Sequence, residues 1–119
     1  MNGANIANQK SIGSTSSSAF EYIPVPNDFK LSPAYPNPFN PSTNIHYAVP
    51  IDMHIKISVY DILGQEVSIL ASGFTASGYY ETVWDGSDHA SGIYFIRMNA
   101  YDEGNTLQFN KIQKIMLVK

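Results

Sequence analysis

The stretch HIKISVY, residues 54–60, decides the fold class of this chain. Its apolar residues Ile55, Ile57 and Val59 alternate with more polar neighbours, and this period of two is the one that a β-strand imposes on side chains. One face of such a strand packs on a core while the other meets solvent. The stretch therefore predicts a half-buried strand of an antiparallel sheet.

Further strands are predicted on both sides of this one. A partner follows directly, after a turn in which Gly64 supplies a positive φ. Runs rich in Val, Ile, Tyr, Thr and Phe then recur at intervals of about ten residues, with Gly, Pro, Asn and Asp between them and no helical periodicity. The seven predicted strands cover residues 29–32, 43–49, 54–60, 65–71, 79–84, 93–101 and 106–118. This number favours an all-β, immunoglobulin-like antiparallel sandwich, although the sequence leaves a closed barrel open.

The predicted core collects apolar residues from one face of these strands. Its members are Ile45, Tyr47, Ile55, Ile57, Val59, Val67, Ile69, Val83, Tyr94, Ile96 and Met98. The last predicted strand is about twice the usual length of ~5–6 residues, and its pattern changes halfway. We therefore expect a β-bulge or a move between sheets at residues 111–114, and an exposed edge strand blunted by lysines.

Length and composition favour one domain, because 119 residues are about the size of a single core. The N-terminal part is rich in Ser and Asn and poor in large apolar side chains, so it cannot offset the entropy of ordering its backbone. We therefore predict a disordered, flexible linker over residues 1–28 and a β-sandwich over residues 29–119. Pro24 and Pro26 make the end of this linker stiffer.

The same composition disfavours several classes of protein. The net charge of −3 and the scattered basic residues argue against nucleic-acid binding. There is no cysteine for a disulfide or a thiolate metal site, and no apolar stretch reaches the ~20 residues of a transmembrane helix. The N-terminus lacks the basic-then-apolar order of a signal peptide, so an exported form would carry its leader on a longer precursor.

No constellation of residues points to catalysis or to a cofactor. The histidines lack the spacing of a metal pair, and neither a GxSxG elbow nor a glycine-rich phosphate loop is present. Three loop carboxylates are imaginable calcium ligands, but their spacing lacks the dense alternation of a calcium loop; they are Asp85, Asp88 and Asp102. We predict a protein that is not an enzyme and that has no catalytic, cofactor-binding or metal-ligating residue.

A proline-rich stretch, YPNPFNPSTNI, spans residues 35–45. Its prolines fix φ and bias the residues before them toward extended geometry, which predicts a stiff connector anchored in the sandwich by Phe39. Asp61 and Asp85 are expected to accept backbone N–H bonds in turns. Trp84 is expected to pack in the core or at its rim rather than to serve as a sugar platform.

Residues 35–45 strongly resemble the opening of type IX secretion C-terminal sorting domains (Por secretion system, type A) of the Bacteroidota and related phyla. Further blocks resemble the family in the same order: VYDILGQEV at residues 59–67, WDG at 84–86, ASGIYF at 90–95 and the basic, aliphatic end at 111–119. The residues that carry the resemblance are Pro36, Asn37, Pro38, Phe39, Asn40, Pro41, Asp61, Gly64, Trp84, Asp85, Gly86, Gly92 and Tyr94.

The resemblance implies a non-catalytic domain that directs a cargo protein, attached upstream in the precursor, across the outer membrane. The implied partners are the type IX translocon, its outer-membrane shuttle and a sortase that removes the domain. The implied route leads through the periplasm to the cell surface or the extracellular space.

From the residues themselves, we expect the receptor to read the strand edge that carries Lys111, Lys114 and Lys119. An unpaired edge invites β-augmentation, and lysines deter indiscriminate pairing. Two alternatives stay open. One is a retained surface adhesin that binds carbohydrate or protein through the aromatic residues Tyr79, Tyr80 or Trp84. The other is a self-assembling structural subunit like the immunoglobulin-like part of flagellar hook-capping proteins, to which the sorting family is similar.

Overall fold

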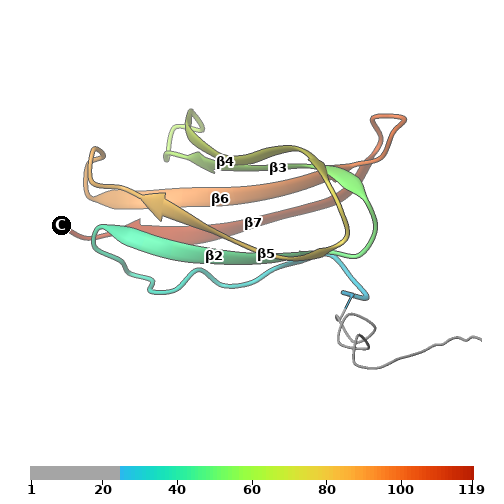
Figure 1. Cartoon of the computed structure of the whole chain (residues 1–119). Helices are drawn as coiled ribbons and strands as arrows, with labels where there is room; N and C mark the ends of the chain where they lie inside the picture. The colour runs from blue at the N-terminus through green and yellow to red at the C-terminus, as the bar shows by residue number, and fades with distance from the viewer. Residues whose placement is uncertain (1–24) are drawn as a thin grey trace, which may run out of the picture.

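A computed structural model describes residues 25–119, so most of the predicted linker over residues 1–28 lies outside this part of the chain. Seven strands form two antiparallel sheets that face each other (Figure 1). The strands are β1 (Lys30–Leu31), β2 (Ser42–Val49), β3 (Met53–Tyr60), β4 (Glu66–Thr75), β5 (Gly78–Asp85), β6 (Gly92–Tyr101) and β7 (Leu107–Leu117). Within residues 25–119, no helix has the length and apolar character needed to cross a membrane.

The two sheets have the orders β1-β2-β5 and β4-β3-β6-β7. The hairpins β3-β4 and β6-β7 stay within the larger sheet, and the connection from β1 to β2 stays within the smaller one. The connections β2-β3, β4-β5 and β5-β6 pass between the sheets. Seven strands divided three against four are typical of immunoglobulin-like sandwiches, here with β4 paired to β3. The predicted all-β sandwich is confirmed.

The core lies between the sheets, and β3 contributes to it as its alternation predicts. Ile55, Ile57 and Val59 are 2% exposed or less, while the intervening side chains point away from the core. The other side chains of the buried cluster are Leu31, Ala34, Phe39, Ile45, Tyr47, Val49, Met53, Trp84, Tyr94, Ile96, Met98, Ala100, Ile115 and Leu117.

Two predicted core residues are wrong, and one is only partly buried. Ile69 is 55% exposed because the pairing of β4 with β3 shifts next to it, which brings Leu70 toward the core in its place. Val83 is 51% exposed because its neighbour Trp84 points into the core, and successive side chains of a strand point to opposite faces. Val67 packs against the core from its rim.

The prediction of a break at residues 111–114 is also wrong. Strand β7 stays in one sheet, and its register with β6 is regular from Leu117 to Phe109. The register shifts only where Tyr101 pairs with Leu107, which leaves Gln108 as the extra residue. The sequence pattern changes because only the C-terminal part of β7 packs on the buried core. Near the start of β7, Phe109 stacks on Phe29 with ring centroids 5.2 Å apart.

Candidate functional site

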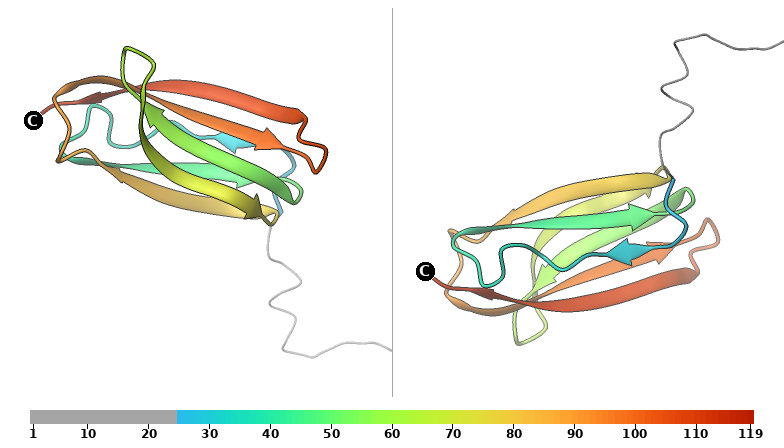
Figure 2. Two further views of the ribbon diagram at one scale, coloured as in Figure 1. Left: turned by 90° about the horizontal axis from the view of Figure 1, so that it is seen from above. Right: turned by 90° about the horizontal axis from the view of Figure 1, so that it is seen from below.

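The proline-rich residues 35–41, here called the brace, connect the two sheets along one side of the sandwich. Figure 2 (right) shows this segment between β2 and β7. Tyr35 and Asn44 exchange two backbone hydrogen bonds of 3.0 and 2.9 Å, which fix the start of the brace to β2. The Thr43 hydroxyl is fully buried and donates to the Pro36 carbonyl at 2.7 Å. The brace is therefore attached to one sheet while it contacts the edge of the other.

The end of the brace pairs with the C-terminal strand as a short parallel strand would. The Phe39 N–H donates to the Met116 carbonyl at 2.9 Å, and the Val118 N–H donates to the Phe39 carbonyl at 3.0 Å. Phe39 and Leu117 form a parallel β-bridge. The expectation of an unpaired edge at the chain end is therefore wrong for residues 114–118, since the brace occupies their outward-facing backbone groups.

Two side-chain amides complete this attachment by standing in for backbone groups. Asn37 Nδ2 donates to the Lys114 carbonyl at 3.1 Å, and Asn37 Oδ1 accepts the Met116 N–H at 3.0 Å. In the opposite direction, Gln113 Nε2 donates to the Ser32 carbonyl at 2.7 Å, and its Oε1 accepts the Ala34 N–H at 2.8 Å. Gln113 was not among the predicted site residues. The sequence signal for Gln113 is a polar residue at a position where the alternation along the strand places an inward-facing side chain.

An aromatic cluster anchors the brace. Phe39 is 2% exposed, and its ring centroid lies 5.6 Å from that of Trp84. Trp84 is itself buried and packs edge-on against Tyr94 at 5.0 Å. The Tyr94 hydroxyl donates to the Ala90 carbonyl at 2.6 Å and so closes the β5-β6 loop. The expectation that Trp84 packs in the core or at its rim is therefore confirmed, and of the aromatic residues in the adhesin alternative Tyr79 is 62% exposed.

Gly86, at the start of the β5-β6 turn, contacts both the brace and the terminal strand. Its N–H donates to the Pro41 carbonyl at 2.8 Å. A Cβ atom at this position would lie 3.0 Å from Leu117 Cδ2 and 3.4 Å from the Pro41 oxygen. Any side chain at this position would therefore require the Leu117 side chain to move by a few tenths of an ångström.

Asp85 stabilises the same turn from outside. One of its oxygens accepts the Ser87 N–H at 2.9 Å and also the Ser87 hydroxyl. These hydrogen bonds, from the hydroxyl first and the N–H second, lower the pKa of the Asp85 carboxyl below its ordinary value of 3.8. Asp102 caps a different turn, at the other end of β6, by accepting the Thr106 N–H. The two carboxylates are too far apart to share one cation.

The lowered pKa of Asp85 predicts part of the acid sensitivity of the fold. A carboxyl with a depressed folded-state pKa stabilises the native state above its unfolded pKa, and this stability is lost as the pH falls through the folded value. Urea unfolding between about pH 5 and about pH 2 should therefore show a shallower loss of stability in Asp85→Asn than in the unsubstituted chain. Asp88→Asn, in the same loop, is the control. Equal slopes for Asp85→Asn and the unsubstituted chain would contradict this role.

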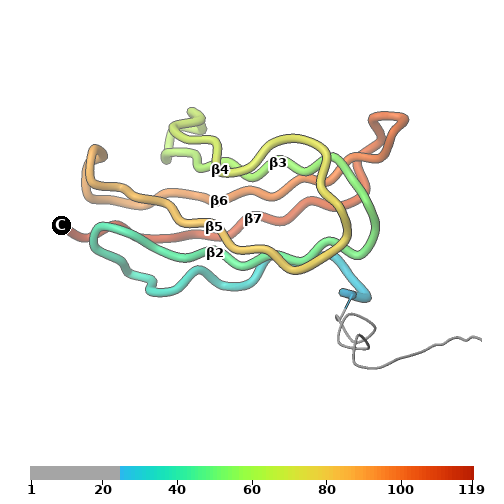
Figure 3. Tube along the Cα trace, in the orientation of Figure 1, coloured from blue at the N-terminus to red at the C-terminus, as the bar shows by residue number. Residues whose placement is uncertain are grey.

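The three terminal lysines do not lie on one face. Lys114 pairs with Phe95 and points away from the core, whereas Lys111 pairs with the buried Met98 and lies on the inward face. Both are exposed, and neither belongs to an ion pair within residues 25–119. Lys119 lies beyond β7, where its ammonium donates to the Ser87 carbonyl at 2.6 Å. Figure 3 shows the C-terminus beside the β5-β6 loop.

Of the remaining motif residues, Asp61 and Gly64 lie apart from the brace, whereas Gly92 pairs with Leu117 at the end of β7. Asp61 and Gly64 build the turn between β3 and β4, away from the brace, while Gly92 opens β6 beside the aromatic cluster. The fold thus brings together Pro36, Asn37, Pro38, Phe39, Asn40, Pro41, Trp84, Asp85, Gly86, Gly92 and Tyr94 around the end of β7. Most of the motif residues therefore lie where they hold the terminal strand in place.

Comparison with protein-family models finds a match over most of the described residues. The model of one protein family, described as the secretion system C-terminal sorting domain, matches residues 33–115. The matched range includes the brace, both turns and β7 as far as Ile115. A search of curated proteins finds no match.

Proposed function

Since the chain belongs to the family of type IX secretion C-terminal sorting domains, we propose that it directs an attached upstream cargo protein across the outer membrane. Family membership implies export to the cell surface or beyond it. The proposed route passes through the periplasm, and the proposed partners are the translocon, its outer-membrane shuttle and a sortase. The domain itself acts without catalysis. The family match is the observation that carries this proposal.

The positions of the two chain ends support a role as a carried signal. The first described residues lie at one end of the sandwich, and the C-terminus lies at the other (Figure 1). A cargo attached upstream therefore emerges far from the C-terminal end of β7, although the start of β7 lies near the first described residues, where Phe109 stacks on Phe29. We propose residues 1–28 as the linker in which the sortase cleaves, and residues 29–119 as the sorting domain.

The test is a reporter protein fused upstream of the full chain and expressed in a host that has this secretion system. The reporter should reach the cell surface or the medium in this host and should stay inside an otherwise identical host that lacks the translocon. A reporter without the domain is the control. Equal export from both hosts, or retention in both, would disprove the sorting function.

Within this function, we propose that the receptor reads the charges of Lys111, Lys114 and Lys119. The brace covers the strand edge at residues 114–118, which makes the lysine side chains better candidates than the backbone for recognition at the chain end. Exposed charges raise association rates and set specificity without holding the fold together. A receptor that reads these side chains can bind the folded domain, because the strand end does not have to separate from the brace.

Substituting all three lysines by Gln should therefore reduce export about tenfold or more while leaving the unfolding midpoint almost unchanged. The control is the combination of Lys30→Gln and Lys56→Gln, which removes two positive charges elsewhere on the sandwich, including that of Lys56 in its ion pair with Glu66. The export of each fusion and the urea unfolding of each purified chain are the two measurements. If the triple variant is folded and exported like the control, the lysines are not the recognised feature.

A further inference from the structure

The turn between β3 and β4 is rigid. One Asp61 oxygen accepts the N–H groups of Leu63 and Gln65 at 2.9 and 3.0 Å. The backbone closes the same turn, since the Gly64 N–H donates to the Asp61 carbonyl and the Asp61 N–H donates to the Gln65 carbonyl, both at 3.0 Å. Gly64 has a φ of 82°, in the region that favours glycine. The turn needs Asp61 and Gly64, and it places no demand on the two side chains between them.

Those two side chains are nevertheless large and apolar. Ile62 and Leu63 are 70% and 79% exposed, at positions where turns usually carry polar residues. Neither contributes to the buried cluster of the sandwich. A rigid turn that holds two aliphatic side chains in solvent is preorganised for contact with a partner, because little side-chain or loop entropy remains to be lost.

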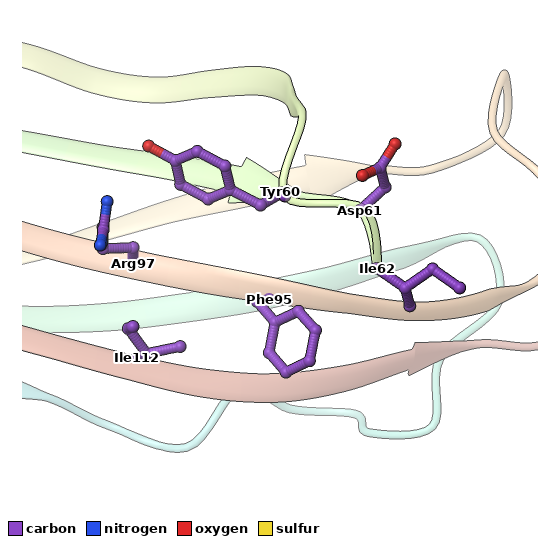
Figure 4. A pocket seen from close by; sticks show the side chains of 7 residues that line it. Tyr60, Asp61, Ile62, Phe95, Arg97 and Ile112 are labelled. Carbon is purple, nitrogen blue, oxygen red and sulfur yellow. The ribbon is translucent and has the colours of Figure 1, made fainter.

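The turn borders a hollow on the outer face of the larger sheet, the face that points away from β1-β2-β5. The hollow has a volume of about 360 Å³ and lies over Tyr60, Phe95, Arg97 and Ile112. Figure 4 shows Phe95 between Ile62 at one end and Arg97 at the other. Ile112 is 51% exposed. Together with the turn, these residues make a continuous apolar face with a cationic end.

The charges around the hollow are divided between its two ends, because Asp61 lies at the turn and the cationic Arg97 lies at the opposite end. The Arg97 guanidinium lies over the Tyr60 ring, 5.5 Å from its centroid, and Lys114 is the cross-strand neighbour of Phe95. The ion pairs within residues 25–119 are His46 with Glu81 and Lys56 with Glu66. In this part of the chain, Arg97 and Lys114 therefore have no carboxylate partner.

We propose that this face docks a protein segment in which aliphatic or aromatic side chains alternate with carboxylates. The apolar side chains contact Ile62, Leu63 and Phe95, and the carboxylates pair with Arg97 and Lys114. The inference rests on the proposed function, because the segment then belongs to a component of the export machinery. This face is distinct from the brace, which lies along the edge of β7.

The first test uses a defined probe. A peptide with the sequence Glu-Leu-Glu-Phe-Glu, blocked at both ends, is titrated into the ¹⁵N-labelled chain and followed by NMR. Shifts are expected at residues 60–64, 95–97 and 112–114, and the combination of Ile62→Ser and Leu63→Ser should weaken binding about tenfold. The matched control combines Ile51→Ser and Val83→Ser, at exposed apolar sites elsewhere. Absent binding, shifts elsewhere, or equal binding of the Lys-Leu-Lys-Phe-Lys peptide would overturn the proposal.

The second test places the same two pairs of substitutions in the reporter fusion. Export should fall about tenfold for the Ile62 and Leu63 pair and stay unchanged for the control pair. Both pairs affect exposed side chains, and their unfolding curves verify that the fold is kept. If the unsubstituted fusion is exported and the Ile62 and Leu63 variant equals it, the docking face is disproved while the sorting function stands. If the unsubstituted fusion is not exported, the sorting function itself fails.

Discussion

Deleting residues 111–119 should unfold the sandwich rather than only remove a recognition signal. The deletion takes away Ile115 and Leu117, which are 0% and 1% exposed. Losing one buried aliphatic side chain costs ~2–5 kcal/mol, so losing both costs ~4–10 kcal/mol. This loss is comparable with the ~5–15 kcal/mol by which a domain is stable. The ladder with β6 and the pairing with the brace are lost in addition.

Circular dichroism and urea unfolding of the truncated chain measure this effect. We expect no cooperative transition in the truncated chain, whereas deletion of Lys119 alone should leave the transition nearly intact because that residue contributes no buried side chain. A cooperative transition at the unsubstituted midpoint in the chain that ends at residue 110 would contradict the placement of β7 in the core. An export defect of this truncated chain would therefore not show that the lysines are recognised, because unfolding alone would cause the same defect.

Replacing Phe39 by Ala should destabilise the domain by ~3–5 kcal/mol, because a large aromatic side chain is removed from a packed site. Phe39 is 2% exposed and contacts Trp84, and its backbone holds the end of β7. The midpoint of urea unfolding should fall accordingly. Hydrogen exchange at the Val118 N–H, which donates to the Phe39 carbonyl, should accelerate as the brace loosens.

Tyr35→Ala is the matched control, because it removes another aromatic side chain from the same brace. Tyr35 is 76% exposed, and its contacts with Asn44 are made by backbone groups that the substitution keeps. The expected change in stability is within ~0.5 kcal/mol. Similar destabilisation by both substitutions would show that the brace acts through chain stiffness, and not through the anchoring of Phe39.

The parts of the fold that sequence reasoning predicts are those governed by local periodicity. The strict alternation of Ile55, Ile57 and Val59 identifies β3 and its buried face. In β4 the same reasoning fails at Ile69, because register shifts change which side chains point inward and leave no mark in the alternation. Trp84, expected at the core or its rim, is buried, and this displaces Val83 from the inward face.

The brace could be predicted only in part. Three prolines indicate a stiff connector, and the anchoring role of Phe39 follows from its being the large apolar residue among them. Its destination could not be predicted, because Asn37 and Gln113 make contacts across 77 to 81 residues of sequence through side-chain amides. Such contacts follow from topology and have no periodic signal. For the same reason the strand edge was expected to be unpaired.

The most direct test of the central claim, that the domain is sorted as a folded sandwich with its terminal strand held by the brace, is the export of three reporter fusions. These carry the unsubstituted chain, Phe39→Ala and Tyr35→Ala, at a temperature where purified Phe39→Ala is unfolded and the other two are folded. We predict export of the unsubstituted and Tyr35→Ala fusions and retention of the Phe39→Ala fusion. Export of the unfolded Phe39→Ala fusion at the unsubstituted level would contradict the claim, because the signal would then lie in the sequence of the tail alone.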